Sequence, residues 1–161
     1  MKSEYLKIKG KWKILASLCL ALSFAFAAAC GGPASENSSN ADSSASAGTS
    51  TGEQSAATNT GARSAAMNTG YQSAATNTGA RSAATNTGNW SAATVGGAES
   101  IAVVTGYGSK AKGAVGCWLV LTERDEKMHI LGVQAVCVDG ETIKADTFYM
   151  LKNGAIIEVD E

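Results

Sequence analysis

Few side chains in this sequence have the types and spacing that covalent or metal chemistry requires. His129 is the only histidine, so a serine-histidine-acid arrangement would have to use it. It follows Met128 at a predicted turn or strand start, and we expect it to face solvent. Cys117 and Cys137 are too few for structural zinc, which usually takes four nitrogen or sulfur ligands. The sequence therefore predicts no catalytic residue, no metal site and no cofactor.

The N-terminus predicts export. Five lysines precede an apolar run, residues 14–29, that ends in small residues, which is the order of a secretory signal. The run is shorter than the roughly 20 residues of a membrane span. Its end, Ala27-Ala28-Ala29-Cys30-Gly31-Gly32, resembles a bacterial lipobox, which implies that Cys30 is lipidated and becomes the mature N-terminus. Lipoboxes favour leucine where this chain has Ala27, so simple secretion after cleavage stays the alternative.

Export bears on the charge and on the two remaining cysteines. Removing residues 1–29 takes five lysines and Glu4 from 13 basic and 14 acidic residues, which leaves 8 and 13 and a net charge of about −5. A nucleic-acid partner is thereby disfavoured, because such binding needs a basic face. In an oxidising compartment Cys117 and Cys137 could form a disulfide. Two buried free thiols fit the sequence as well.

Residues 30–51 are rich in serine, alanine and asparagine, and they contain no aromatic residue. Such a composition cannot bury enough apolar surface to order itself, so we expect a disordered tether after the signal peptide of residues 1–29.

A nine-residue repeat dominates residues 52–114. Glycine recurs at 52, 61, 70, 79, 88, 97 and 106, and serine at 55, 64, 73, 82, 91, 100 and 109. Fixed self-similarity of this kind is typical of a solenoid. Calcium-binding nonapeptide repeats need an aspartate in each unit, and residues 52–96 contain none, so we expect no calcium. The predicted fold class is all-β, a short solenoid with a small antiparallel cap.

The least regular unit indicates which side chains point inward. Lys110 and Lys112 must reach water, and strand side chains alternate, so Ser109, Ala111 and Gly113 should point inward. The same phase puts serine, alanine and asparagine of every regular unit inside, with stacked asparagines. The residues after each glycine alternate with a period of 18, which predicts two units per coil and Arg63 stacked over Arg81. We expect each glycine to supply a corner with positive φ.

These repeats resemble known proteins. The runs Ser-Ala-Ala-Thr-Asn-Thr-Gly and residues 106–118 look like those of uncharacterised nonapeptide-repeat proteins of bacterial and prophage genomes, over roughly residues 53–161. That resemblance brings no known activity, although a phage-associated structural role is one implication. The Ser-x-Ala-x-Gly phrase is similar, more weakly, to head repeats of trimeric autotransporter adhesins.

Residues 115–161 differ in character, with bulky apolar residues and five predicted short strands. Asp139-Gly140 and Asn153-Gly154 are hairpin signals. We expect an antiparallel cap domain that closes the last coil.

Function should therefore lie on the repeated surface. The first hypothesis is a surface-anchored or secreted structural or adhesive protein without catalysis, which contacts a glycan, a cell-wall polymer or a surface protein, singly or as an oligomer. Exposed aromatic and arginine residues most often anchor interfaces, and the candidates are Arg63, Tyr71, Gln72, Arg81 and Trp90. The alternative is binding of ice or ordered water through outward Thr-x-Thr rows. These rows comprise Thr58, Thr60, Thr76, Thr78, Thr85 and Thr87.

The lipidation hypothesis predicts that Cys30→Ala abolishes lipid-dependent processing, because the cysteine sulfur carries the diacylglyceryl group. The variant should be lost from the membrane fraction. The parent protein should stay in that fraction, and mass spectrometry should find the added mass of the lipid on its N-terminal fragment. Fractionation and mass spectrometry measure both outcomes. Unchanged membrane retention of Cys30→Ala would contradict the lipid anchor.

Overall fold

Each nine-residue repeat forms one four-residue strand and one turn. The structure is a computed structural model that describes residues 45–160, so Cys30 and the signal segment lie outside the described residues. Within this range the protein is all-β. The twelve strands are β1 (Ala47–Ser50), β2 (Ala56–Asn59), β3 (Ala65–Asn68), β4 (Ala74–Asn77), β5 (Ala83–Asn86), β6 (Ala92–Val95), β7 (Ile101–Val104), β8 (Lys110–Gly113), β9 (Trp118–Arg124), β10 (Ile130–Cys137), β11 (Phe148–Lys152) and β12 (Ala155–Val159). No helix of residues 45–160 has the length and apolarity of a membrane crossing.

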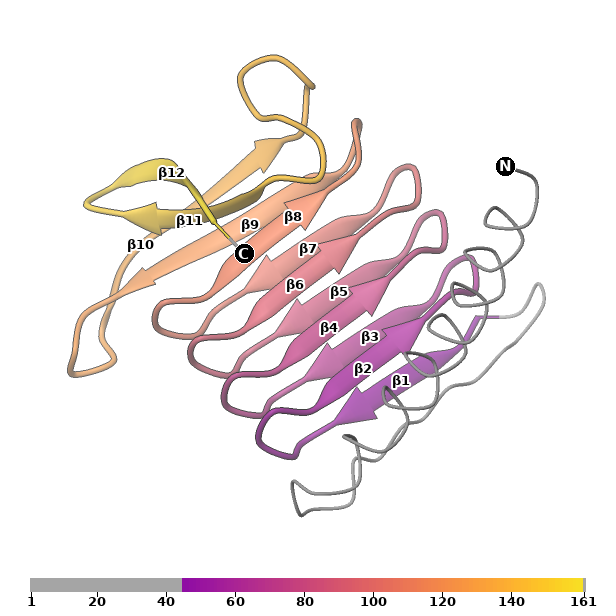
Figure 1. Ribbon diagram of the computed structural model, residues 1–161, viewed down its shortest axis with the longest axis horizontal. Coiled ribbons are helices and arrows are strands. Elements are labelled where there is room, and N and C mark those ends of the chain that lie inside the picture. Colours follow the sequence, from indigo (N-terminus) through magenta and orange to yellow (C-terminus); the bar gives the residue numbers. More distant parts are fainter. Residues whose placement is uncertain (1–44, 161) are drawn as a thin grey trace, which may run out of the picture. The chain divides into compact units, whose positions relative to one another are not determined.

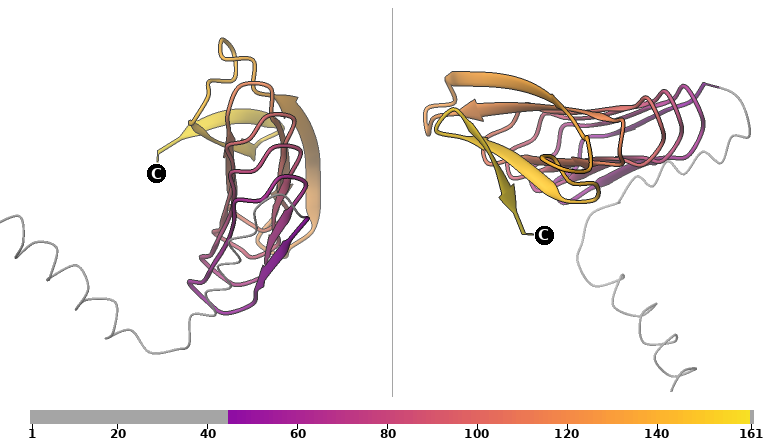
Figure 2. Two further views of the ribbon diagram at one scale, coloured as in Figure 1. Left: turned by 90° about the vertical axis from the view of Figure 1, so that its right-hand side faces the viewer. Right: turned by 90° about the horizontal axis from the view of Figure 1, so that it is seen from above.

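Alternate strands build the two walls of a solenoid (Figure 1, Figure 2). One wall, here called sheet A, has the order β1-β3-β5-β7-β9-β10, and the other, sheet B, has the order β12-β11-β8-β6-β4-β2. Each strand from β1 to β7 pairs in parallel with the strand two positions later, and Ala56 lies opposite Ala74. This offset of 18 residues confirms the prediction of two units per coil.

The solenoid extends beyond residues 52–114 at both ends. Strand β1 lies inside the segment 30–51 that was expected to be a disordered tether, and it pairs in register with β3. Strand β9 lies inside the expected cap, but it pairs in parallel with β7 as a further coil strand. Both boundaries were therefore wrong, because the Ser-Ala-Gly-Thr-Ser run at 46–50 and the Cys-Trp-Leu-Val-Leu run at 117–121 keep the inward alternation without the consensus letters.

The predicted strand phase is confirmed. Serine, alanine and asparagine of the regular units are buried, and Ala56, Thr58 and Thr60 are exposed. Ala75, Ala84 and Ala93 have no exposed area. The interior changes along the coil, because Val95 and Val104 occupy the asparagine row in later units and Leu119 and Leu121 follow. The solenoid therefore has a polar core at one end and an apolar core at the other.

The buried asparagines stack in register, but their amides bond mainly to the main chain. Asn77 at the end of β4 accepts a hydrogen bond from the Gly79 N–H at 3.1 Å. Its amide nitrogen donates to the Ser64 carbonyl at 3.1 Å and to the Ala83 carbonyl at 3.3 Å, both on the sheet A side. Asn59, Asn68 and Asn86 repeat this pattern. Each amide thus joins the two walls and two successive coils, and its hydrogen-bonding capacity is filled.

The glycine that recurs in every repeat is required for a different reason from the one expected. Positive φ occurs two residues after the glycine, at Gln54, Arg63, Gln72, Arg81, Trp90 and Glu99. The glycine itself is needed because coils stack closely at the corner. A Cβ on Gly88 would lie 1.8 Å from the Gly70 carbonyl oxygen, far inside contact distance. Ser91 donates to the same Gly70 oxygen at 3.2 Å, which ties one coil to the next.

The last three strands lie at one end of the coil (Figure 2). Tyr149 and Leu151 of β11 belong to the apolar core there. Strand β10 returns antiparallel to β9, while β11 pairs antiparallel with β8 and forms a hairpin with β12. The Asn153-Gly154 hairpin is confirmed, with positive φ at both residues. The expected strand 142–144 and the Asp139-Gly140 hairpin were wrong. Asp139 instead accepts the Glu141 and Ile143 N–H groups in a longer loop, bonds that lower the pKa of its carboxyl group.

We expect Asn77→Ala to destabilise the protein by about 1–3 kcal/mol, because the buried Gly79 N–H loses its partner and the Ser64 and Ala83 carbonyls each lose one hydrogen bond. The neighbouring Thr78→Ala, at an exposed position, should change the free energy of unfolding by no more than about 0.5 kcal/mol. Urea unfolding measures both variants. Equal losses would show that the asparagine amides do not hold the walls together.

We also expect Gly88→Ala to prevent the native stacking of coils, with a loss above the usual overpacking range of about 1–3 kcal/mol. Gly96→Ala is the matched control, since its Cβ would meet nothing closer than Thr78 atoms at 3.7 Å. That variant should unfold near the urea concentration of the parent. Tolerance of Gly88→Ala would contradict the close approach at the corner.

Candidate functional site

The turns of the solenoid form two separate edges. Turns 52–54, 70–72, 88–90 and 106–108 lead from sheet A to sheet B, and we call them the aromatic edge. Turns 61–63, 79–81 and 97–99 lead back, and we call them the arginine edge. The positive φ at the third residue of a turn is a left-handed conformation that turns the side chain out at the corner. Main-chain bonds such as Gln54 N–H to the Tyr71 carbonyl, at 2.8 Å, fix the spacing along each edge.

The five predicted binding residues do not form one surface. Arg63 and Arg81 lie on the arginine edge, one coil apart, as the period of 18 predicted. The other three, Tyr71, Gln72 and Trp90, lie on the aromatic edge across the solenoid. All five side chains are exposed, yet the hypothesis of a single repetitive face needs this correction.

The arginine edge is partly neutralised. The Arg81 guanidinium contacts the Glu99 carboxylate at 3.0 Å, and both groups are largely exposed. A shallow hollow beside this edge runs from Ser46 over Ala65 and Ala83 to Ile101. Arg63 and Arg81 line it together with Ile101 and otherwise small side chains. The Glu99 carboxylate partly neutralises one of these two guanidinium groups, that of Arg81.

The aromatic edge carries a preorganised aromatic pair. Trp90 and Tyr107 meet edge to face, with ring centroids 5.5 Å apart. Gly108 lies one coil above Trp90, and a Cβ there would sit 2.9–3.1 Å from the six-membered ring of the indole. Only glycine therefore lets the Trp90 ring rest against this turn. About half of the Trp90 surface, 54%, remains in water.

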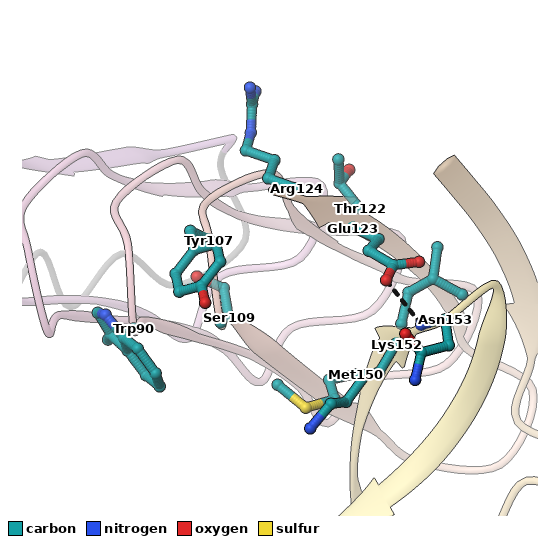
Figure 3. A pocket seen from close by; sticks show the side chains of 11 residues that line it. Trp90, Tyr107, Ser109, Thr122, Glu123, Arg124, Met150, Lys152 and Asn153 are labelled. Carbon is teal, nitrogen blue, oxygen red and sulfur yellow. Dashed lines mark hydrogen bonds between the residues drawn. The ribbon is translucent and has the colours of Figure 1, made fainter. Parts of the chain in front are cut away.

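A pocket of about 330 Å³ opens between this aromatic pair and the last hairpin (Figure 3). Trp90 and Tyr107 line one side, and Met150, Lys152 and Asn153 of the β11–β12 hairpin line the other. The end of β9 contributes the remaining polar groups, which are Thr122, Glu123 and Arg124. The pocket combines an aromatic wall with several polar groups, the composition of many ligand sites.

Hydrogen bonds between β9 and the hairpin hold the pocket in shape. The Glu123 carboxylate accepts the N–H groups of Asn153 and Gly154 at 2.6 and 2.9 Å. Gln134 on β10 donates to the Gly154 carbonyl at 2.8 Å. Arg124 donates to the Thr105 and Met128 carbonyls at 2.5 and 2.6 Å. Both walls are therefore fixed before any ligand arrives.

His129 lies in the exposed β9–β10 turn, as expected. Its Nδ1 atom is 2.9 Å from the Asp125 carboxylate, and 72% of its side chain is exposed. The same carboxylate accepts the N–H groups of Lys127 and His129. The hydrogen bond from the His129 side chain is the main cause that lowers the pKa of Asp125. This histidine-aspartate pair closes a turn, and neither residue lines the pocket beside Trp90.

Cys117 and Cys137 are not bonded to each other. Cys117 is fully buried, and its sulfur lies 3.1 Å from the Gly97 carbonyl oxygen. Cys137 pairs with Trp118, so its side chain points to the outer face of sheet A. Neighbouring positions on a strand face opposite ways, and the disulfide alternative fails for that reason.

The threonine rows are divided as well. Thr58 with Thr60 and Thr76 with Thr78 lie on the sheet B side, where the next unit has Thr94 and Gly96. Thr85 and Thr87 belong to the sheet A side, where Met67 interrupts the row. Each wall therefore carries too short a Thr-x-Thr array for the ice-binding hypothesis to gain support.

The sequence identified Trp90 but not the groups that complete the pocket. The period of 18 could have placed Tyr107 above Asn89 and Gly108 above Trp90. No sequence pattern could have placed the hairpin residues in the pocket, because their position follows from tertiary packing. No group of three or more histidine, cysteine or acidic residues in residues 45–160 is placed to hold a metal ion. No protein-family model, curated protein or solved structure matches the chain.

Proposed function

We propose that this chain is an exported, non-catalytic adhesive protein that binds a surface carbohydrate, such as a glycan or a cell-wall polysaccharide, in the pocket at its aromatic edge. The observation that carries the proposal is the half-exposed Trp90, seated against Gly108 and Tyr107 beside a polar wall. Tryptophan and tyrosine offer an apolar ring with a polar tip, which suits a sugar ring that has apolar C–H faces and polar hydroxyl groups.

Rigid walls favour binding by this site. The Trp90 ring is immobilised by its neighbours, so a ligand that stacks on it does not have to restrict a free side chain. Lys152 and Asn153 on the opposite wall can donate hydrogen bonds to sugar hydroxyl or carboxyl groups. A pocket of about 330 Å³ lies at the lower end of the range for small-ligand sites, which fits one or two sugar units of a longer polymer.

The solenoid gives this site a stalk. Strands β1 to β9 form a continuous coil, and the proposed lipid at Cys30, which would attach the protein to a membrane, precedes its first strand in the sequence. Tyr71 and Gln72 lie one coil below Trp90 on the same edge, and they extend the surface along which a polymer could run. The alternative is that the protein is secreted without a lipid anchor.

We expect Trp90→Ala to weaken binding of the protein to its polysaccharide by at least about tenfold, since buried aromatic anchors cost about 2 kcal/mol or more when truncated. Glycan arrays and pull-down on insoluble cell-wall material identify the ligand, and titration gives the affinity.

Arg63→Ala is the matched control, because this residue is also exposed but lies on the opposite edge. It should bind like the parent. Equal affinity of Trp90→Ala and the parent would rule out the pocket, and an equal loss in both variants would indicate non-specific adhesion by the whole surface.

A further inference from the structure

Strand β10 is a sheet edge whose only protection is a bulge near its start. It has eight residues, ends sheet A, and carries neither a charged residue nor proline in the sequence Ile-Leu-Gly-Val-Gln-Ala-Val-Cys. Proteins usually protect a long edge strand with charges, proline or bulges, because its open main-chain groups pair readily with another strand. By contrast, β1 and β2 have four residues each, and β12 carries Glu158.

The main-chain groups that face the open edge can be identified. Val138, just after β10, bonds to the two residues just before β9, since its N–H donates to the Cys117 carbonyl and its carbonyl accepts the Gly116 N–H. These directions alternate along a strand, so the N–H and C=O groups of Cys137, Ala135 and Val133 point away from β9. A bulge interrupts the ladder between Ile130 and Gly132, which limits regular pairing to Val133–Cys137.

The outer face beside this edge is apolar. Trp118 on β9 and Val133 on β10 are 50% and 56% exposed, and Ile101 on β7 is 37% exposed. Val120, Ala135 and Cys137 lie on the same face by their pairing. A contiguous exposed apolar patch on a protein surface marks an interaction site more often than a single exposed residue does.

We propose that β10 pairs antiparallel with β10 of a second copy of this chain, around a two-fold axis at Ala135. Pairing over Val133–Cys137 puts Ala135 opposite the partner's Ala135 and Val133 opposite the partner's Cys137. All three open residues then exchange main-chain hydrogen bonds, and the outer faces of the two sheets become one apolar surface. Each outer row across the contact then consists of Trp118, Cys137, the partner's Val133 and the partner's Thr122, in that order.

Charge and symmetry favour a second copy as the occupant. A two-fold contact brings each group near its own duplicate, so a charged strand would repel itself, whereas β10 contains no charge. The open groups belong to a main chain, so only another strand satisfies them all. The antiparallel order that β10 already has with β9 continues across the axis, and the contact closes with two chains.

Cross-linking of the full chain tests this geometry. In a Cys137→Ser background, Ala135→Cys places two thiols directly across the axis, where Cα atoms of a hydrogen-bonded pair lie about 5.5 Å apart, within disulfide range. Mild oxidation with diamide should convert most of the chain to a species of twice the mass on a non-reducing gel. The Cys137→Ser parent gives the baseline from Cys19, Cys30 and Cys117.

Val120→Cys in the same background is the matched control, because this residue shares the face but lies one strand back on β9. The two Val120 positions would be three strand spacings, or about 14 Å, apart, so no disulfide should form. Cross-linking of Ala135→Cys no greater than that of Val120→Cys would overturn the proposal.

Light scattering supplies a second readout that does not depend on cysteine. Ala135→Lys sets two ammonium groups against each other at the axis, and its mass in detergent solution should be half that of the unaltered chain. Ala56→Lys, on the exposed face of β2, should keep the full mass. An unaltered chain that is monomeric at every concentration, or a dimer that survives Ala135→Lys, would contradict pairing through β10.

Discussion

The buried asparagine amide is the interaction on which the regular part of the solenoid depends. An interior lined with serine and alanine gains little from apolar burial, so its polar groups must be satisfied completely. Asn77 meets this demand with one accepted and two donated main-chain bonds, from strand ends on both walls. These amides therefore set the distance between the sheets as well as the register of successive coils.

The same requirement explains the glycines and serines. Coils stacked this close leave no room for a Cβ between corner residues such as Gly70 and Gly88, and the buried Gly70 carbonyl needs donors, which Ser73 and Ser91 provide. Where valine replaces asparagine, at Val95 and Val104, leucines of β9 soon follow and burial takes over as the stabilising force. The polar and apolar parts of the core thus meet within one continuous coil.

The two proposed surfaces follow from how the coil ends. A solenoid of identical units would repeat each edge residue without limit, but the returning β10 and the β11–β12 hairpin break the symmetry at one end. The hairpin meets the aromatic edge and encloses the pocket beside Trp90, while β10 leaves a fresh edge on sheet A. Carbohydrate binding and self-association would therefore use different sides of the same closing element and could operate together.

The sequence by itself determined the repeat, the coil of two units and the inward phase, because a period of nine and two lysines in one strand fix which side chains alternate inward. It also indicated Trp90 and the single Asn153-Gly154 hairpin. It could not place the ends of the coil, since Ala47–Ser50 and Trp118–Arg124 pair by position and not by consensus letters. Only the tertiary structure decided that Arg63 and Trp90 lie on opposite edges and that Cys117 and Cys137 face apart. It also brought Lys152 and Asn153 to Trp90, because long-range packing of the last hairpin leaves no periodic trace in the chain.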